Sequence, residues 1–245
     1  MKAQKKRWFP VDFCNSRPAP DKPNNGPPLK EKWKQLLPLG NRKLRNKERV
    51  WVALYRYTAP AKWQGCTDRD DDEITPASLD PDERKYAWAL LVGPKEDAID
   101  PSLAVQGRRI QVVEDPYNAR WQLEGLMQNN IRNTGPDMLV RVLVGKIVDK
   151  PRFGAAVYAT PVGEDDPAYR NMWWVFEALE RLREGGGVRE GVVGEGARLE
   201  WMQVAMVVKS LYEKRAAAGI FDKKYDANTP KPAFDLMKER WIFEG

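Results

Sequence analysis

The order of hydrophobic and polar residues divides the chain into a strand-rich part followed by a helix-rich part. Short runs rich in valine, leucine and aromatic residues predict β-strands. These runs lie at residues 49–57, 85–95, 108–115, 119–126 and 137–149. The last run is almost continuous in Val, Leu and Ile, which is typical of a strand in the interior of a sheet.

Helical periodicity replaces strand alternation after residue 150. Helices are predicted at 151–158, 168–184 and 199–219, with a Gly-rich connection at 184–198 between the last two. Hydrophobic residues at helical spacing predict which faces of the two longer helices pack inward. They are Met172, Val175, Phe176, Leu179 and Leu182 in the first, and Trp201, Val204, Val208 and Leu211 in the second.

Strands followed by helices favour an α+β fold over a doubly wound one. We expect a mostly antiparallel sheet of about five strands with packed helices, formed by a single domain at residues 49–245. Residues 1–48 hold seven of the 19 prolines, so this segment is predicted to be an extended arm. One short amphipathic helix is expected within it, at 29–37.

Charge is distributed unevenly along the chain. Residues 1–49 hold 14 Lys and Arg against 4 Asp and Glu, and the remaining residues hold 27 against 31. The net charge of +6 is therefore +10 on the first segment and −4 on the rest. Basic residues interspersed with aromatic ones are typical of segments that contact phosphates and unpaired bases. We therefore expect the partner to be aminoacylated tRNA or another RNA, although a solubilising or localising tail is the alternative.

The predicted nucleic-acid contacts share a positive charge and a place in or next to the arm. They are Lys5, Lys6, Arg7, Lys32, Lys34, Arg42, Lys43, Arg45, Lys47 and Arg49.

Several kinds of chemistry are excluded by composition. The chain has no histidine and two cysteines, Cys14 and Cys66. Imidazole catalysis, a disulfide framework and a four-ligand Cys/His zinc site are therefore absent, and we expect no metal or cofactor. No hydrophobic run approaches the ~20 residues of a membrane-spanning helix, and no secretory signal is evident. We therefore expect a cytoplasmic protein with no membrane contact.

Three short motifs resemble an uncharacterised fungal family. They are WALLVGP at 88–94, WVxxAL at 174–179 and PxxDL at 232–236, and the resemblance covers about residues 49–244. That family is similar to permuted papain-like proteins related to the lecithin:retinol acyltransferases, in which a strand histidine precedes a helix-start cysteine. Here Ala87 stands at the histidine position, and Arg170, Asn171 and Met172 stand near the cysteine position. The resemblance thus implies a papain-like scaffold whose site is either dead or remade.

A remade site suits a substrate that arrives already activated. Aminolysis of an ester such as aminoacyl-tRNA needs an amine, proton transfer and oxyanion stabilisation, but no protein nucleophile. A site of this kind, which uses aminoacyl-tRNA as an activated substrate, makes the chain similar in character to the fungal arginine-containing cyclodipeptide synthases. That similarity implies tRNA-dependent aminoacyl transfer that forms a cyclodipeptide, with arginine as one of the joined residues, in specialised metabolism.

This hypothesis assigns a role to each candidate residue. Asn171, at a predicted helix start, would contact the carbonyl or oxyanion, and Tyr86 or Tyr55 would move protons. The remaining substrate-binding candidates line an acyl pocket or bind an arginyl side chain: Trp88, Arg170, Trp173, Trp174, Asp71 and Glu73. The alternative for the tryptophans is the hydrophobic core, and for the acidic run at 68–73 a solvated loop.

Two other functions stay open at this point. One is a catalytically silent papain-like module whose basic arm binds RNA or an acidic protein. The other is a cyclase or isomerase that acts on a small metabolite in an aromatic pocket.

Overall fold

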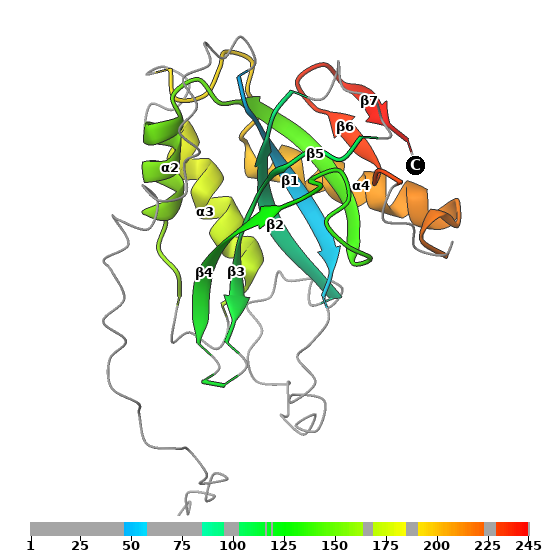
Figure 1. The fold of residues 1–245 in the computed structure, drawn as a ribbon, viewed down its shortest axis with the longest axis horizontal. Coiled ribbons are helices and arrows are strands. Elements are labelled where there is room, and N and C mark those ends of the chain that lie inside the picture. Colours follow the sequence, from blue (N-terminus) through cyan, green and yellow to red (C-terminus); the bar gives the residue numbers. More distant parts are fainter. Residues whose placement is uncertain are drawn as a thin grey trace, which may run out of the picture. The chain divides into compact units, whose positions relative to one another are not determined.

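The structure is a computed structural model. It describes residues 47–57, 85–95, 103–115, 117–118, 120–163, 169–184, 191–222 and 229–244 (Figure 1). These residues form an α+β fold with a mostly antiparallel sheet, so the predicted fold class is confirmed at this level. The predicted arm at 1–48 lies outside the described residues except for positions 47 and 48.

A seven-stranded sheet forms the centre of the fold. In order across the sheet, its strands are β4 (Trp121–Gln128), β3 (Gly107–Glu114), β2 (Tyr86–Gly93), β1 (Arg49–Arg56), β5 (Met138–Lys146), β6 (Ala233–Asp235) and β7 (Arg240–Phe243). Neighbouring strands run antiparallel except β5 and β6, which are parallel.

The sheet contains the five predicted strands and two more than were predicted. The strand predicted to lie in the interior became β5, which is paired on both sides, with β1 and β6. The additional strands β6 and β7 have three and four residues. Runs of that length are too short to show a two-residue period, which explains why the sequence pattern did not predict them.

The helices begin and end close to the predicted positions. They are α2 (Lys150–Tyr158), α3 (Asn171–Glu184) and α4 (Trp201–Ala217), and a 3-10 turn, η5 (Ile220–Asp222), follows α4. None of the helices in the described part of the chain is long and apolar enough to cross a membrane.

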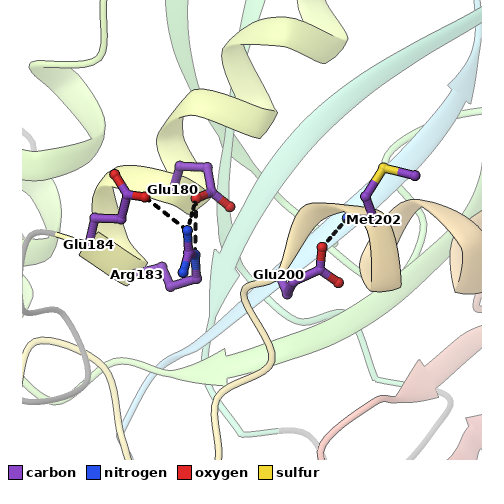
Figure 2. Close-up of polar contacts among 5 residues, drawn as sticks. All are labelled: Glu180, Arg183, Glu184, Glu200 and Met202. Carbon is purple, nitrogen blue, oxygen red and sulfur yellow. Dashed lines mark hydrogen bonds and ion pairs between the residues drawn. The ribbon is translucent and has the colours of Figure 1, made fainter.

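Local polar contacts fix where the helices start and stop. The carboxylate of Glu200 accepts a hydrogen bond from the backbone N–H of Met202 at 2.9 Å (Figure 2). It accepts a second one from the backbone N–H of Gln203 at 2.7 Å. It thereby satisfies amides that have no partner within α4. In the last turn of α3, Arg183 pairs with Glu180 and Glu184, where its positive charge complements the helix dipole (Figure 2).

The helices cover one face of the sheet, which we call the helix-covered face. Its core joins strand residues such as Val52 and Leu90 to helix residues such as Trp174 and Val208, each of them fully buried. Of the helix residues predicted to face inward, Phe176 and Trp201 are only partly buried and the others are buried.

A second, smaller core lies on the other face of the sheet, which we call the helix-free face. It contains Trp51, Ala53 and Tyr55 from β1, together with Ala89 and Leu91 from β2. Alternation along β1 therefore sends Val50, Val52 and Leu54 to one core and Trp51, Ala53 and Tyr55 to the other.

Candidate functional site

The first residue of α3, Asn171, contacts strand β2 directly. Its side-chain Oδ1 accepts a hydrogen bond from the backbone N–H of Trp88, with an N···O distance of 3.3 Å. The residue is 8% exposed. Within the described part of the chain, the Nδ2 amide of Asn171 makes no hydrogen bond. One end of this carboxamide is therefore held in place, and the other keeps two N–H donors available.

Arg170 lies at the start of α3, and Tyr57 lies within electrostatic reach of it. Arg170 directly precedes Asn171, and its Nη1 donates to the backbone oxygen of Tyr169 at 2.7 Å. Burial and, after it, the negative charge of Glu114 raise the pKa of Tyr57, while the positive charge of Arg170 lowers it. Tyr57 consequently lies within electrostatic reach of both groups and stays protonated near neutral pH. Tyr57 and Glu114 belong to no sequence motif, and the analysis of the sequence did not single them out.

Two of the three tryptophans predicted to line an acyl pocket lie in the core. Trp88 is 1% exposed and Trp174 is fully buried. The ring of Trp88 packs edge-to-face on Trp201, with centroids 5.1 Å apart. Trp173 is only partly buried, and its ring lies 6.4 Å from that of Phe176. Trp88 and Trp174 therefore belong to the hydrophobic core, which was the alternative to an acyl pocket.

The three predicted catalytic residues are divided by the sheet. Tyr86 packs with the helix-covered face, where its ring lies edge-to-face on Tyr212 at 5.1 Å. Asn171 lies on this same side. Tyr55 belongs to the helix-free face, so it does not share a site with Asn171. Ala87 also packs on the helix-free face, and a side chain at that position points away from α3.

The remaining predicted residues lie mostly outside the described part of the chain. Asp71 and Glu73 fall outside it, and so do the predicted RNA contacts Lys5, Lys6, Arg7, Lys32, Lys34, Arg42, Lys43 and Arg45. Of the two that are described, Lys47 is exposed, and its backbone oxygen accepts a hydrogen bond from Nη1 of Arg49 at 2.7 Å. No group of three or more His, Cys, Asp or Glu that could hold a metal occurs among the described residues.

Two shallow hollows lie elsewhere on the described surface. One lies between α4 and the β6–β7 pair, where Met206, Leu211 and Trp241 contribute to its lining. The other lies beside Lys47, Lys150 and the start of α2. Neither Asn171 nor Tyr55 lines either of these two hollows.

The helix-free face carries two arginines packed over aromatic rings. The Cζ atom of Arg109 lies 5.2 Å from the ring centroid of Tyr55, and that of Arg141 lies 4.5 Å from the ring of Trp51. The hydroxyl of Tyr55 forms a hydrogen bond of 2.9 Å with Oγ1 of Thr134. Tyr55 was a candidate from the sequence, whereas neither arginine was predicted, because single arginines within strands form no motif.

Comparison with known proteins identifies the family of this chain. Neither the curated proteins nor the solved structures provide a match. A family model does match, over residues 47–243, which includes every strand and helix described above. The chain therefore belongs to the family described as "Family of unknown function (DUF6914)".

Proposed function

We propose that the chain is a tRNA-dependent aminoacyl-transfer enzyme that forms a cyclodipeptide. The observation that carries this proposal is the carboxamide of Asn171, which Trp88 holds at Oδ1 and whose Nδ2 amide can donate to a substrate carbonyl. A fixed donor of this kind stabilises the oxyanion that develops when an amine attacks an ester. Such a reaction requires neither the histidine nor the cysteine that position 87 and the start of α3 lack.

The proposed reaction consists of two aminolysis steps. In the first, the α-amine of one aminoacyl ester attacks the ester carbonyl of the other. A C–N bond forms, the C–O bond to the ribose breaks, and a proton passes from the amine to the ribose oxygen. The free α-amine of the resulting dipeptidyl-tRNA then attacks its own ester carbonyl in the same way, which closes the ring and releases the second tRNA.

Residues at the start of α3 supply the groups that these steps need. Asn171 donates to the carbonyl oxygen, and the positive charge of Arg170 favours the oxyanion. Tyr57 stays protonated because burial and Glu114 raise its pKa, so it can give a proton to the leaving ribose oxygen. Glu114 accepts the proton of the attacking amine and returns it to the Tyr57 phenolate, so that both groups are restored before the second step.

The basic N-terminal segment supplies the contact with tRNA in this proposal. Its excess of ten positive charges over residues 1–49 suits the phosphate backbone of an acceptor stem. The contact is electrostatic and needs no recognition of sequence, so the identity of the aminoacyl group would be read at the transfer site.

A second candidate is a catalytically silent module that binds RNA. The observation that favours it is the complete burial of Trp174 and the near-complete burial of Trp88. Because the rings of Trp88 and Trp174 lie in the core, they do not line a space for an acyl group. Tyr55 lies on the other face of the sheet. This candidate predicts RNA binding without turnover.

The test is production of the full chain in a bacterial host, with mass spectrometry of the medium for new cyclic dipeptides. The purified protein is then incubated with charged tRNA, with and without ribonuclease. We expect a diketopiperazine that disappears with ribonuclease. Asn171→Asp keeps an acceptor for Trp88 but removes the donor, and we expect it to reduce turnover by about 100-fold.

The matched control is Asn118→Asp, which changes an exposed asparagine and should leave turnover unchanged. If no cyclic dipeptide forms while the protein still binds RNA with a steep salt dependence, the silent module replaces the enzyme.

A further inference from the structure

Small residues lie on the helix-free face of the two central strands. Ala53 of β1 pairs with Ala89 of β2 and with Arg141 of β5, and Ala87 pairs with Tyr55. Methyl groups at three neighbouring positions form a low floor between larger side chains. Ala53 and Ala89 are fully buried.

Tyr55 and two arginines are among the side chains on this face. Arg109 comes from β3 and Arg141 from β5, so the two guanidinium groups approach Tyr55 from opposite sides of the central strands. Both positive charges act on the Tyr55 phenol, because each lowers its pKa, although burial raises the pKa by more. The three groups therefore form one electrostatic unit.

Arg109 has no carboxylate to balance its charge in the described structure. Glu124 lies on the neighbouring strand β4, but its Oε2 accepts a hydrogen bond from Nε2 of Gln111 at 3.0 Å and forms no ion pair with Arg109. Asp235, on β6, is paired with Lys238. The Nε atom of Arg109 is buried and has no hydrogen-bond partner, while the residue as a whole remains partly exposed.

A buried guanidinium nitrogen without a partner is unfavourable, because it has given up its hydration without a compensating hydrogen bond. An oxyanion at the exposed part of the guanidinium would provide the missing negative charge, since a guanidinium matches phosphate and carboxylate in a two-point geometry. The hydroxyl groups of Tyr55 and Thr134 are bonded to each other at 2.9 Å, and Oγ1 of Thr134 donates to Sδ of Met138 at 3.5 Å. Tyr55 therefore contributes to this site through its ring, over which the guanidinium of Arg109 lies.

We propose that Arg109 and Tyr55 form an oxyanion-binding site on the helix-free face, which takes the phosphate or carboxylate group of a small ligand. Arg141 adds positive charge from the far side of the same floor. The site is separate from the groups at the start of α3, because the sheet lies between them. It therefore stands whether or not the chain transfers aminoacyl groups.

The test is a calorimetric titration of the full chain with inorganic phosphate, with acetate, and with chloride at matched ionic strength. We expect saturable binding of phosphate or acetate and none of chloride, and the stronger of the two oxyanions identifies the preferred group. Arg109→Gln should weaken that binding by about tenfold or more, because it removes a charge-assisted hydrogen bond. Tyr55→Phe keeps the ring and should weaken it by a smaller factor.

The matched control is Arg152→Gln, which removes the same charge from the exposed surface of α2 and should leave binding unchanged. Arg109→Lys serves if Arg109→Gln does not fold, since it keeps the charge and loses only the two-point geometry. Equal heats with chloride and the oxyanions, or unchanged affinity in both Arg109 variants, would overturn the proposal.

Discussion

The side chain of Asn171 and the backbone N–H of Trp88 form a hydrogen bond that joins the first residue of α3 to the middle of β2, across 83 residues of sequence. The contact fixes the start of the helix against the sheet. A buried backbone N–H needs a partner, and here a side chain provides it. The position of the proposed carbonyl donor and the stability of the fold thus depend on the same carboxamide.

Asn171→Ala should lower the free energy of unfolding by about 1–3 kcal/mol, because the N–H of Trp88 loses its acceptor inside the protein. Urea denaturation measures this directly. Asn118→Ala removes an exposed asparagine whose Oδ1 accepts from the N–H of Arg120, and we expect a change of no more than about 0.5 kcal/mol. Equal effects of the two substitutions would show that the contact with Trp88 contributes nothing to stability.

Trp174→Ala should reduce the free energy of unfolding by about 3–5 kcal/mol, since it empties a fully buried site. Its neighbour Trp173 is partly exposed, so Trp173→Ala should have less than half of that effect. Denaturant unfolding of both variants compares a core residue with a surface residue on one helix. A small effect of Trp174→Ala would instead favour the acyl pocket that the sequence analysis assigned to it.

Substitution by alanine should change the stability of the protein in opposite directions at two glycines. A Cβ at Gly107 would lie 2.5 Å from the backbone oxygen of Val92 and from Cγ2 of Ile131, so Gly107→Ala should destabilise the fold by about 1–3 kcal/mol. A Cβ at Gly154, inside α2, meets nothing within 4 Å. Gly154→Ala should therefore stabilise the protein by about 0.5–1 kcal/mol. A melting temperature below that of the parent for Gly107→Ala, and above it for Gly154→Ala, would support both predictions.

The phenol of Tyr169 should make stability depend on pH in the alkaline range. Burial and the nearby charge of Glu177 raise its pKa from 10.0 to about 12, although a backbone hydrogen bond from Gly163 lowers it. The folded state thus favours the neutral phenol, and its contribution is complete below pH 10 and lost as the pH rises toward 12. Denaturant midpoints between these pH values should fall less steeply for Tyr169→Phe than for the parent. Parallel curves would contradict the assignment.

Deletion of residues 1–46 should weaken RNA binding and leave the fold intact. The segment holds 12 Lys and Arg against 3 Asp and Glu, whereas the family match begins at residue 47. Filter-binding assays at two salt concentrations should show lower affinity and a shallower salt dependence. The melting temperature should not change. Full RNA affinity in the shortened chain would remove the basic segment from both proposed functions.

The sequence allowed the long elements to be predicted, because eight- or nine-residue strands and helices of several turns repeat their pattern often enough to be recognised. It also showed that Val52 and Tyr55 belong to opposite faces of their strand. It did not show which face of β1 shares a side with Trp88, since strand register depends on pairing between distant segments. For this reason Tyr55 was grouped with Asn171, although the sheet separates them.

The groups that the sequence analysis missed share one physical property. Tyr57, Glu114 and Arg109 each lie in or next to a strand and acquire their surroundings only when other strands or helices pack beside them. A single residue of this kind carries no local signal. Asn171 was identified because the family resemblance places it near the cysteine position at a helix start, and α3 indeed begins at this residue.

The parallel pairing of β5 with β6 sets the order in which the molecule can be completed during synthesis. Arg141 pairs with Ala233, so α3 and α4 must both emerge from the ribosome before the outer edge of β5 is covered. Until then a valine- and leucine-rich strand presents open backbone groups to any other nascent chain. The short β6–β7 pair, besides its contacts with both cores, thus closes the edge along which unfinished copies would otherwise aggregate.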